Sequence, residues 1–210
     1  MKLFRPVGLY EMTKILDSKC IEFPKRLEDQ PIFYPVLEYS YAKTIAKDWN
    51  SKDSFSGYVG FITEFEIGDE YIQTKEIHCV GKQEMLEYWI PAEELNEFNK
   101  NIIGKIKIVE AFFGIKYKGI PPNRTLSLQQ GYILNQLQFL DELYHYNGMD
   151  FSGTVSLEYK IINLNLLYWL KTDNNFFILK QIVESLKRNH VLFISDSTLK
   201  KYIDKDDNEK

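Results

Sequence analysis

Residues 57–67 read GYVGFITEFEI, and this stretch decides the fold of the first half of the chain. Every second residue from Val59 to Ile67 is apolar or a threonine, whereas Glu64 and Glu66 fall on the opposite face of an extended chain. A hydrophobic period of two is typical of a half-buried strand in an antiparallel sheet. The stretch therefore predicts an antiparallel sheet with one face toward the core.

Short strands and helices are expected to alternate on both sides of this stretch. The apolar runs that end at or near glycine or proline predict strands at residues 2–7, 31–37, 77–81, 87–91 and 105–114. Apolar side chains at helical spacing predict helices at residues 9–18, at residues 41–50 and after Pro91. Residues 1–114 are therefore predicted to form an α+β domain with a mainly antiparallel sheet.

The second half of the chain has a different pattern. Residues 115–125 contain Gly119 and a Pro-Pro pair, which is the chemistry of turns and linkers. Beyond them, apolar residues recur at helical spacing from Leu126 to Leu143, in 161–170 and in 177–186. These patterns predict a small helical domain at 126–203, and the charged segment 204–210 is predicted to be a disordered tail.

Composition narrows the classes of function. The 210 residues carry a net charge of −4, so the basic surface that duplex DNA binding requires is not indicated. Cys20 and Cys79 have no metal-like spacing and predict two reduced thiols, and the three histidines form no ligand motif, so no metal is expected. Because no apolar run of membrane-spanning length occurs, we expect a cytoplasmic protein with no membrane segment.

A few residues in apolar surroundings are candidates for a binding site. Arg5 places a cation inside the first expected strand, where a guanidinium could fork onto a phosphate. The alternative is an arginine that faces solvent at a sheet edge. Phe33 and Tyr34 are either core residues or a surface on which a flat heterocycle stacks.

Glu87 is the candidate carboxylate. Glu84 lies three residues earlier, and residues three apart on a strand point to opposite faces, so the two glutamates do not form a pair. Trp89 shares the face of Glu87, which predicts a partly dry environment and a stronger attraction of Glu87 to a nearby cation. The alternative is an exposed glutamate on the polar edge of a strand.

Three runs carry a resemblance to a known family: LFRPVGLYE at 3–11, FPKRLEDQPIFYPVLEYSYAKTIAKDWN at 23–50 and EYWIPAEELNEFNKNIIGKIKIVEAFFG at 87–114. They resemble small bacterial proteins that carry the label ADP-ribosylation/crystallin J1, over about residues 3–114. The order of parts is also similar to that of ADP-ribosyltransferases. In those enzymes a cationic residue on a first strand precedes an aromatic or hydroxyl-bearing strand with a helix, and a glutamate follows on a later strand.

The resemblance implies a split sheet of the ADP-ribosyltransferase type, NAD as the substrate and no metal. Arg5 would hold the phosphates or ribose of NAD. Phe33, Tyr34 and Trp49 would line the nicotinamide pocket. Glu87 would be catalytic, binding the ribose 2′-hydroxyl and stabilising the positive charge that develops as nicotinamide leaves.

The acceptor of ADP-ribose, a protein or a nucleic acid, does not follow from the resemblance. Arginine-specific members carry an acid or amide where this chain has Met85, and IFYPV stands in place of their Ser-Thr-Ser motif. The helical half would recruit the target or another protein partner. Two alternatives stay open: a non-catalytic module that binds NAD, another nucleotide or a protein, and an arrangement in which the helices cover the cleft.

Overall fold

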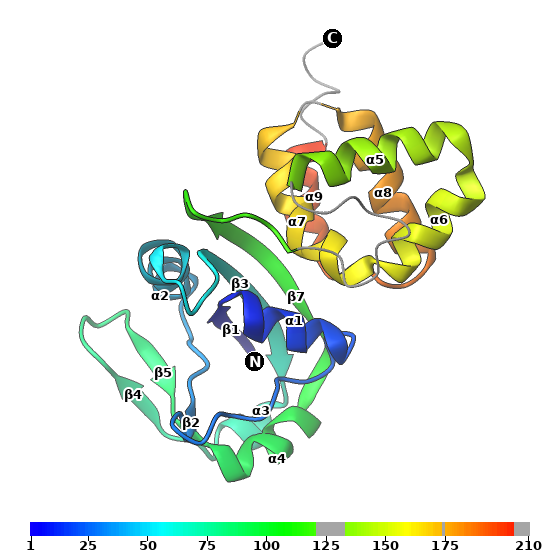
Figure 1. Cartoon of the computed structure of the whole chain (residues 1–210). Coiled ribbons are helices and arrows are strands. Elements are labelled where there is room, and N and C mark those ends of the chain that lie inside the picture. Colours follow the sequence, from blue (N-terminus) through cyan, green and yellow to red (C-terminus); the bar gives the residue numbers. More distant parts are fainter. Residues whose placement is uncertain (121–132, 174, 204–210) are drawn as a thin grey trace. The chain divides into compact units, whose positions relative to one another are not determined.

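The structure is a computed structural model that describes residues 1–120, 133–173 and 175–203, and its chain divides into two compact units (Figure 1). The first unit is Met1–Lys116 and the second is Tyr117–Lys210. Small antiparallel sheets and helices make up the first unit, and the second contains helices, so the α+β prediction is confirmed. The expected linker begins beside this division. Its residues 121–125, the expected helix start at Leu126 and the expected tail 204–210 lie outside the described residues.

The main sheet of the first unit has three antiparallel strands in the order β1-β3-β7. They are β1 (Lys2–Val7), β3 (Val59–Ile67) and β7 (Ile102–Phe113). The predicted strand at 57–67 is therefore confirmed as the central one. Its first residues are buried on both faces, including Gly60 and Ile62, which the period of two did not indicate.

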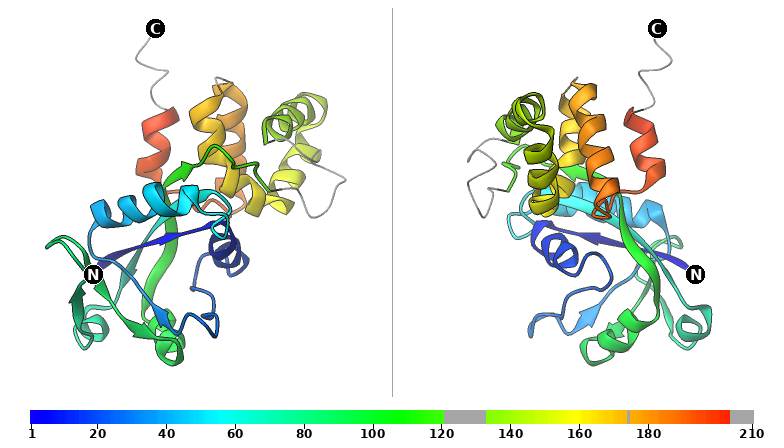
Figure 2. Two further views of the ribbon diagram at one scale, coloured as in Figure 1. Left: turned by 60° about the vertical axis from the view of Figure 1, so that its left-hand side comes forward. Right: turned by 90° about the vertical axis from the view of Figure 1, so that its right-hand side faces the viewer.

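Two helices cover the opposite faces of β1 (Figure 2). Helix α1 (Leu9–Asp17) buries its apolar stripe on one side. On the other side lie α2 (Tyr39–Thr44) and the π-helical turn Ile45–Trp49 that continues it. A Cβ atom at Gly60 would lie 2.1 Å from the carbonyl oxygen of Ala46, so only glycine allows the π-helical turn to approach β3 this closely.

The remaining strands form two short antiparallel pairs outside the main sheet. Strand β2 (Ile32–Phe33) pairs with β6 (Ile90–Pro91), and β4 (Ile77–Cys79) pairs with β5 (Leu86–Tyr88). Val36 bridges Phe4 of β1 and Glu87 of β5. The expected strands 31–37 and 87–91 are thus each divided between two neighbours.

The division has a physical reason at Pro35. Proline has no amide hydrogen to donate to a ladder, and only its carbonyl is used, by the amide of Tyr88 at 2.9 Å. The chain therefore pairs with β6 at Ile32 and Phe33 and reaches β1 only at Val36, so the β2–β6 pair and the main sheet diverge at Tyr34 and Pro35.

An aromatic core joins β2 to the main sheet. The ring centroids of Phe23 and Phe33 are 4.8 Å apart, and those of Phe33 and Phe98 are 5.1 Å apart. Phe65 of β3 contacts Phe23 and Phe98. Phe98 comes from α4 (Leu95–Lys100), which follows the 3-10 turn Ala92–Glu94, and α3 (Asp69–Ile72) follows β3. This core fixes the position of β2 relative to the main sheet.

The second unit contains α5 (Ile133–Tyr146), α6 (Gly148–Leu157), α7 (Tyr159–Thr172), α8 (Phe176–Arg188) and α9 (Asp196–Ile203). The most buried of them is α7, whose Trp169 donates to the carbonyl oxygen of Ile133 at 2.7 Å. Helices were predicted at the positions of α5, α7 and α8. The pattern did not predict α6 or α9, because α6 contains two glycines and several hydroxyl residues and α9 has only eight residues.

Candidate functional site

Arg5 is buried in the first unit, where its guanidinium has three kinds of partner. Its Nε and Nη2 atoms each donate to one carboxylate oxygen of Glu11 at 3.2 Å, and Nη1 donates to the carbonyl oxygen of Tyr34 at 3.1 Å. The guanidinium carbon also lies 4.9 Å from the centre of the Phe33 ring. The solvent-facing alternative for Arg5 is therefore wrong, because its side chain fills the space where the sheets diverge.

A second arginine shares the carboxylate of Glu11. Arg26 Nη1 lies 3.8 Å from the Glu11 oxygen that also accepts from Arg5. Arg26 Nε donates to the carbonyl oxygen of Ile32 at 3.1 Å, and Nη2 donates to Gln30 at 2.9 Å. Burial lowers the pKa of Arg26 most, and the positive charge of Arg5 lowers it further. Two buried cations therefore face one carboxylate.

Glu87 is buried on β5, so the exposed-edge alternative for it is wrong as well. Its carboxylate accepts a hydrogen bond from Trp89 Nε1 at 2.7 Å and a longer one from the Tyr41 hydroxyl at 3.4 Å. The bond confirms that Trp89 shares the face of Glu87. Glu84 is exposed in the turn before β5, so the two glutamates do not form a pair. Burial, and then the Glu87 carboxylate, raise the pKa of Tyr41 above its ordinary value.

Trp89 presents a fixed aromatic surface beside Glu87. The imidazole of His78 stacks on its indole with ring centroids 4.3 Å apart and planes 18° apart. The Tyr34 ring meets the indole edge to face at 6.2 Å. Trp89 is nevertheless 43% exposed, so part of the indole stays open to a ligand.

The structure brings some of the predicted residues together and separates others. The carbonyl oxygen of Tyr34 accepts a hydrogen bond from Arg5, and the ring of Tyr34 contacts Trp89. Trp89 in turn donates to Glu87. Because Phe4, Val36 and Glu87 are directly paired across the strands, their side chains share one face, and Arg5, the neighbour of Phe4, projects to the other. Arg5 and Glu87 therefore lie on opposite faces of the sheet.

Two predicted pocket residues lie away from Trp89. Phe33 is completely buried in the aromatic core, which is the core alternative stated for it. Trp49 is 57% exposed at the end of the π-helical turn. No hydrogen bond or ring contact within residues 1–120 joins Trp49 to Tyr34 or Glu87.

Sequence reasoning missed Glu11, Arg26, Tyr41 and His78. Arg26 sits in the polar run KRLEDQ, which reads as a solvated loop, and Tyr41 reads as an ordinary helix residue. His78 belongs to no ligand motif in the sequence, and in the structure its imidazole stacks on Trp89, whereas its neighbour Cys79 is exposed in the hairpin. The only available signal was Glu11, an acid six residues after Arg5 in LFRPVGLYE.

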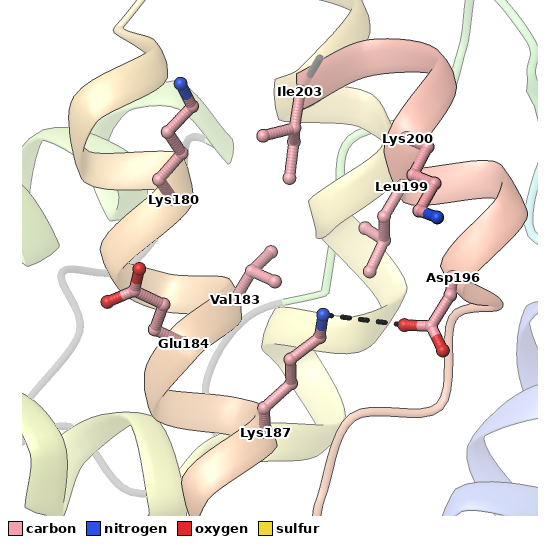
Figure 3. A pocket seen from close by; sticks show the side chains of 8 residues that line it. All are labelled: Lys180, Val183, Glu184, Lys187, Asp196, Leu199, Lys200 and Ile203. Atoms are coloured by element: carbon pink, nitrogen blue, oxygen red, sulfur yellow. Dashed lines mark ion pairs between the residues drawn. The ribbon is translucent and has the colours of Figure 1, made fainter.

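The second unit has a separate groove of about 470 Å³ between α8 and α9 (Figure 3). Lys180 and Lys200 line it from opposite walls, and Lys187 pairs with Asp196 at 3.4 Å. Val183 and Leu199 form its apolar floor and are themselves buried. The groove contains none of the residues that the sequence predicted for a site.

The described parts of both units contain neither a metal-binding cluster nor a membrane-spanning helix. Among residues 1–120, 133–173 and 175–203, no three histidine, cysteine, aspartate or glutamate side chains gather closely enough to hold a metal ion. Within the same ranges, no helix combines the length and the apolar character that a bilayer crossing requires.

Comparison with known proteins adds no further constraint. No family model matches the chain, and neither a curated protein nor a solved structure matches it.

Proposed function

We propose that the first unit binds NAD as its substrate where the two sheets diverge, and that it transfers ADP-ribose to a protein or nucleic-acid acceptor. The observation that carries the proposal is the position of Tyr34. Arg5 donates to its carbonyl oxygen, and its ring contacts Trp89, which holds the Glu87 carboxylate. A cation, an aromatic surface and a carboxylate are thus linked through one residue.

Each of these groups matches a part of NAD. The guanidinium of Arg5 suits the diphosphate, because its planar donors match phosphate oxygens in pairs. The exposed part of the Trp89 indole, with the Tyr34 ring at right angles, offers stacking surface for the nicotinamide or adenine ring. These contacts would bind the ligand and orient it toward Glu87.

Glu87 would stabilise the transition state of the transfer. The bond between ribose C1′ and the nicotinamide nitrogen breaks, and its electron pair stays with nicotinamide. Positive charge then develops on the ribose, and a carboxylate in a water-poor site favours that charge. The acceptor forms the new bond to C1′ and loses a proton.

The spacing across the sheet fits a ligand that extends over more than one strand. Phe4 pairs with Val36, and Val36 pairs with Glu87, so two strand spacings separate β1 from β5. At the usual spacing between neighbouring strands this is about 10 Å. A dinucleotide is longer than this distance, and because Arg5 and Glu87 project from opposite faces, contact with both requires it to pass from one face to the other.

A second candidate is a non-catalytic module that binds NAD or another nucleotide. The side chains of Arg5 and Glu87 project from opposite faces, and Glu87 already accepts from Trp89 and Tyr41. Binding at Arg5 and Trp89 requires no movement of Glu87. Turnover requires Glu87 to exchange its bond with Trp89 for one with the ribose, so these two observations favour binding without turnover.

Calorimetric titration with NAD tests NAD binding, which both candidates predict. The unmodified protein should bind, Arg5→Ala should bind more weakly, and Glu87→Gln should keep most of its affinity. Arg188→Ala, an exposed arginine in the second unit, is the matched control and should bind like the unmodified protein. If no heat of binding appears at millimolar NAD, the transferase and the NAD-binding module are both wrong.

Release of nicotinamide separates the two candidates. An enzyme should release nicotinamide from NAD at a rate that Glu87→Gln reduces by about 100-fold or more, as expected when a transition-state electrostatic contact is lost. The binding module should bind NAD and release none above the rate in buffer.

A further inference from the structure

We infer that Arg26 is a second phosphate ligand, and that Arg5 and Arg26 together select a diphosphate over a monophosphate. The inference rests on the proposed function only for the identity of the ligand as NAD. The site itself consists of Arg5, Arg26 and Glu11, three charged side chains that the fold brings together from β1, α1 and the loop before β2.

The three side chains are held in fixed positions. The Arg5 and Glu11 side chains are 11% and 21% exposed, and that of Arg26 is 9% exposed. Arg5 is fixed by Glu11 and by the Tyr34 carbonyl group, and Arg26 by Gln30 and the Ile32 carbonyl group. Both guanidinium groups are thus oriented by the protein before any ligand binds, so little side-chain entropy is lost on binding.

The charges of the site do not balance. Two guanidinium groups share one carboxylate, and Asp29, the other acid that acts on Arg26, is exposed, so solvent screens it. A buried charge without a full partner is unfavourable. A bound anion would supply the missing negative charge.

Unused donors are available at the same place. Arg26 Nη1 makes no hydrogen bond within residues 1–120, and its only ion-pair contact there is Glu11 at 3.8 Å. Arg5 Nη1 uses one hydrogen on Tyr34, and its second hydrogen is available. Each arginine can therefore donate to one phosphate group.

The preference for a diphosphate over a monophosphate follows from the available donors of the two arginines. A monophosphate can contact one of the two arginines, whereas two linked phosphates can engage both guanidinium groups. A guanidinium forks onto phosphate oxygens, and a lysine ammonium keeps the charge but loses the fork. Arg26→Lys should therefore reduce diphosphate binding while it preserves the charge of the site.

The test is calorimetric titration of the full chain with AMP, ADP, inorganic pyrophosphate and NAD, repeated on Arg26→Lys. The unmodified protein should bind ADP about tenfold or more tightly than AMP, the scale of one charge-assisted bidentate contact. Arg26→Lys should reduce this ratio to about threefold or less by weakening ADP and not AMP. Arg188→Lys, on the exposed surface of α8, should leave the ratio unchanged.

The outcomes separate this inference from the proposed function. An ADP to AMP ratio that is the same in Arg26→Lys and the unmodified protein overturns the role of Arg26, even where NAD binds. Pyrophosphate binding that depends on Arg26, with no binding of NAD, supports the phosphate site and contradicts the proposed function. Thermal unfolding of Arg26→Lys within a few degrees of the unmodified protein shows that the comparison is made on folded protein.

Discussion

Replacing Glu11 by glutamine removes the half-buried negative charge between Arg5 and Arg26, and this change should destabilise the first unit. Glu11 accepts two hydrogen bonds from Arg5 at 3.2 Å and lies 3.8 Å from Arg26. Glutamine has nearly the same shape, so the change tests charge and not packing. After the change, both guanidinium groups are buried without a carboxylate.

The magnitude follows from the burial of the three side chains. Breaking a buried ion pair by removing one partner costs about 3–5 kcal/mol. Because the Glu11 side chain is 21% exposed and partly screened, we expect the lower end, about 3 kcal/mol. For a unit of this size, such a loss lowers the melting temperature by about 10 °C.

Calorimetric unfolding of the full chain measures this change, since the transition of the second unit serves as an internal reference. Glu97→Gln is the matched control, because Glu97 pairs with Lys100 at 3.2 Å on an exposed surface where the side chains are 59% and 73% exposed. Such pairs contribute about 0–1 kcal/mol. Added pyrophosphate should restore more stability to Glu11→Gln than to the unmodified protein, because an anion replaces the lost charge.

The reasoning is refuted if Glu11→Gln unfolds within about 2 °C of Glu97→Gln, which corresponds to less than about 1 kcal/mol. Such a result would mean that water screens the arginine pair in spite of its burial.

Four further predictions concern other parts of the chain. Burial raises the pKa of Cys20 to about 12, so this thiol stays protonated when folded while the unfolded chain loses the proton above the ordinary value of 9.0. Between these two pKa values Cys20 should lower stability by about 1.4 kcal/mol per pH unit. The decline should be shallower by that amount in Cys20→Ala, where tyrosines with raised pKa values still contribute; an equally steep decline would contradict the burial of Cys20. At neutral pH a thiol reagent should modify the exposed Cys79 at once and Cys20 only after unfolding; equal rates would contradict the burial. Asn163→Ala should destabilise the second unit by about 2–4 kcal/mol in denaturant titration, because the side chain's three hydrogen bonds, with two carbonyl groups and one amide, are lost. A loss near zero would show that water replaces the side chain. Trp89→Phe should cost about 1.5–3 kcal/mol in the same assay, because the buried Glu87 carboxylate loses its shorter hydrogen bond; an unchanged midpoint would contradict that role.

Local patterns predicted most of the elements. The alternation in 57–67 identified β3 because one side of that strand meets the core along its whole length. Burial of its other side depends on α2 and the π-helical turn, which come from a different segment and pack there because Gly60 has no side chain. Periodicity within one segment carries no information about such packing.

The candidate site was predicted in part. Arg5 and Glu87 were identified because each is charged within an apolar run, but that placement left solvent exposure open for both, and their burial is a result of the structure. Their separation onto opposite faces depends on the register of Phe4, Val36 and Glu87, which joins three distant segments. Arg26 was missed because a loop rich in charged residues reads as solvated. In the structure the Arg26 side chain is instead 9% exposed, beside Glu11 and the carbonyl group of Ile32.

Hydrogen–deuterium exchange in the presence of NAD tests the central claim most directly, because it reports both whether NAD binds and where. The account predicts slower exchange at Ile32–Val36 and at Leu86–Ile90, the segments that carry Tyr34, Glu87 and Trp89, with no change in α5 or α7 of the second unit. Unchanged exchange of both segments at millimolar NAD, or protection confined to the second unit, would contradict it.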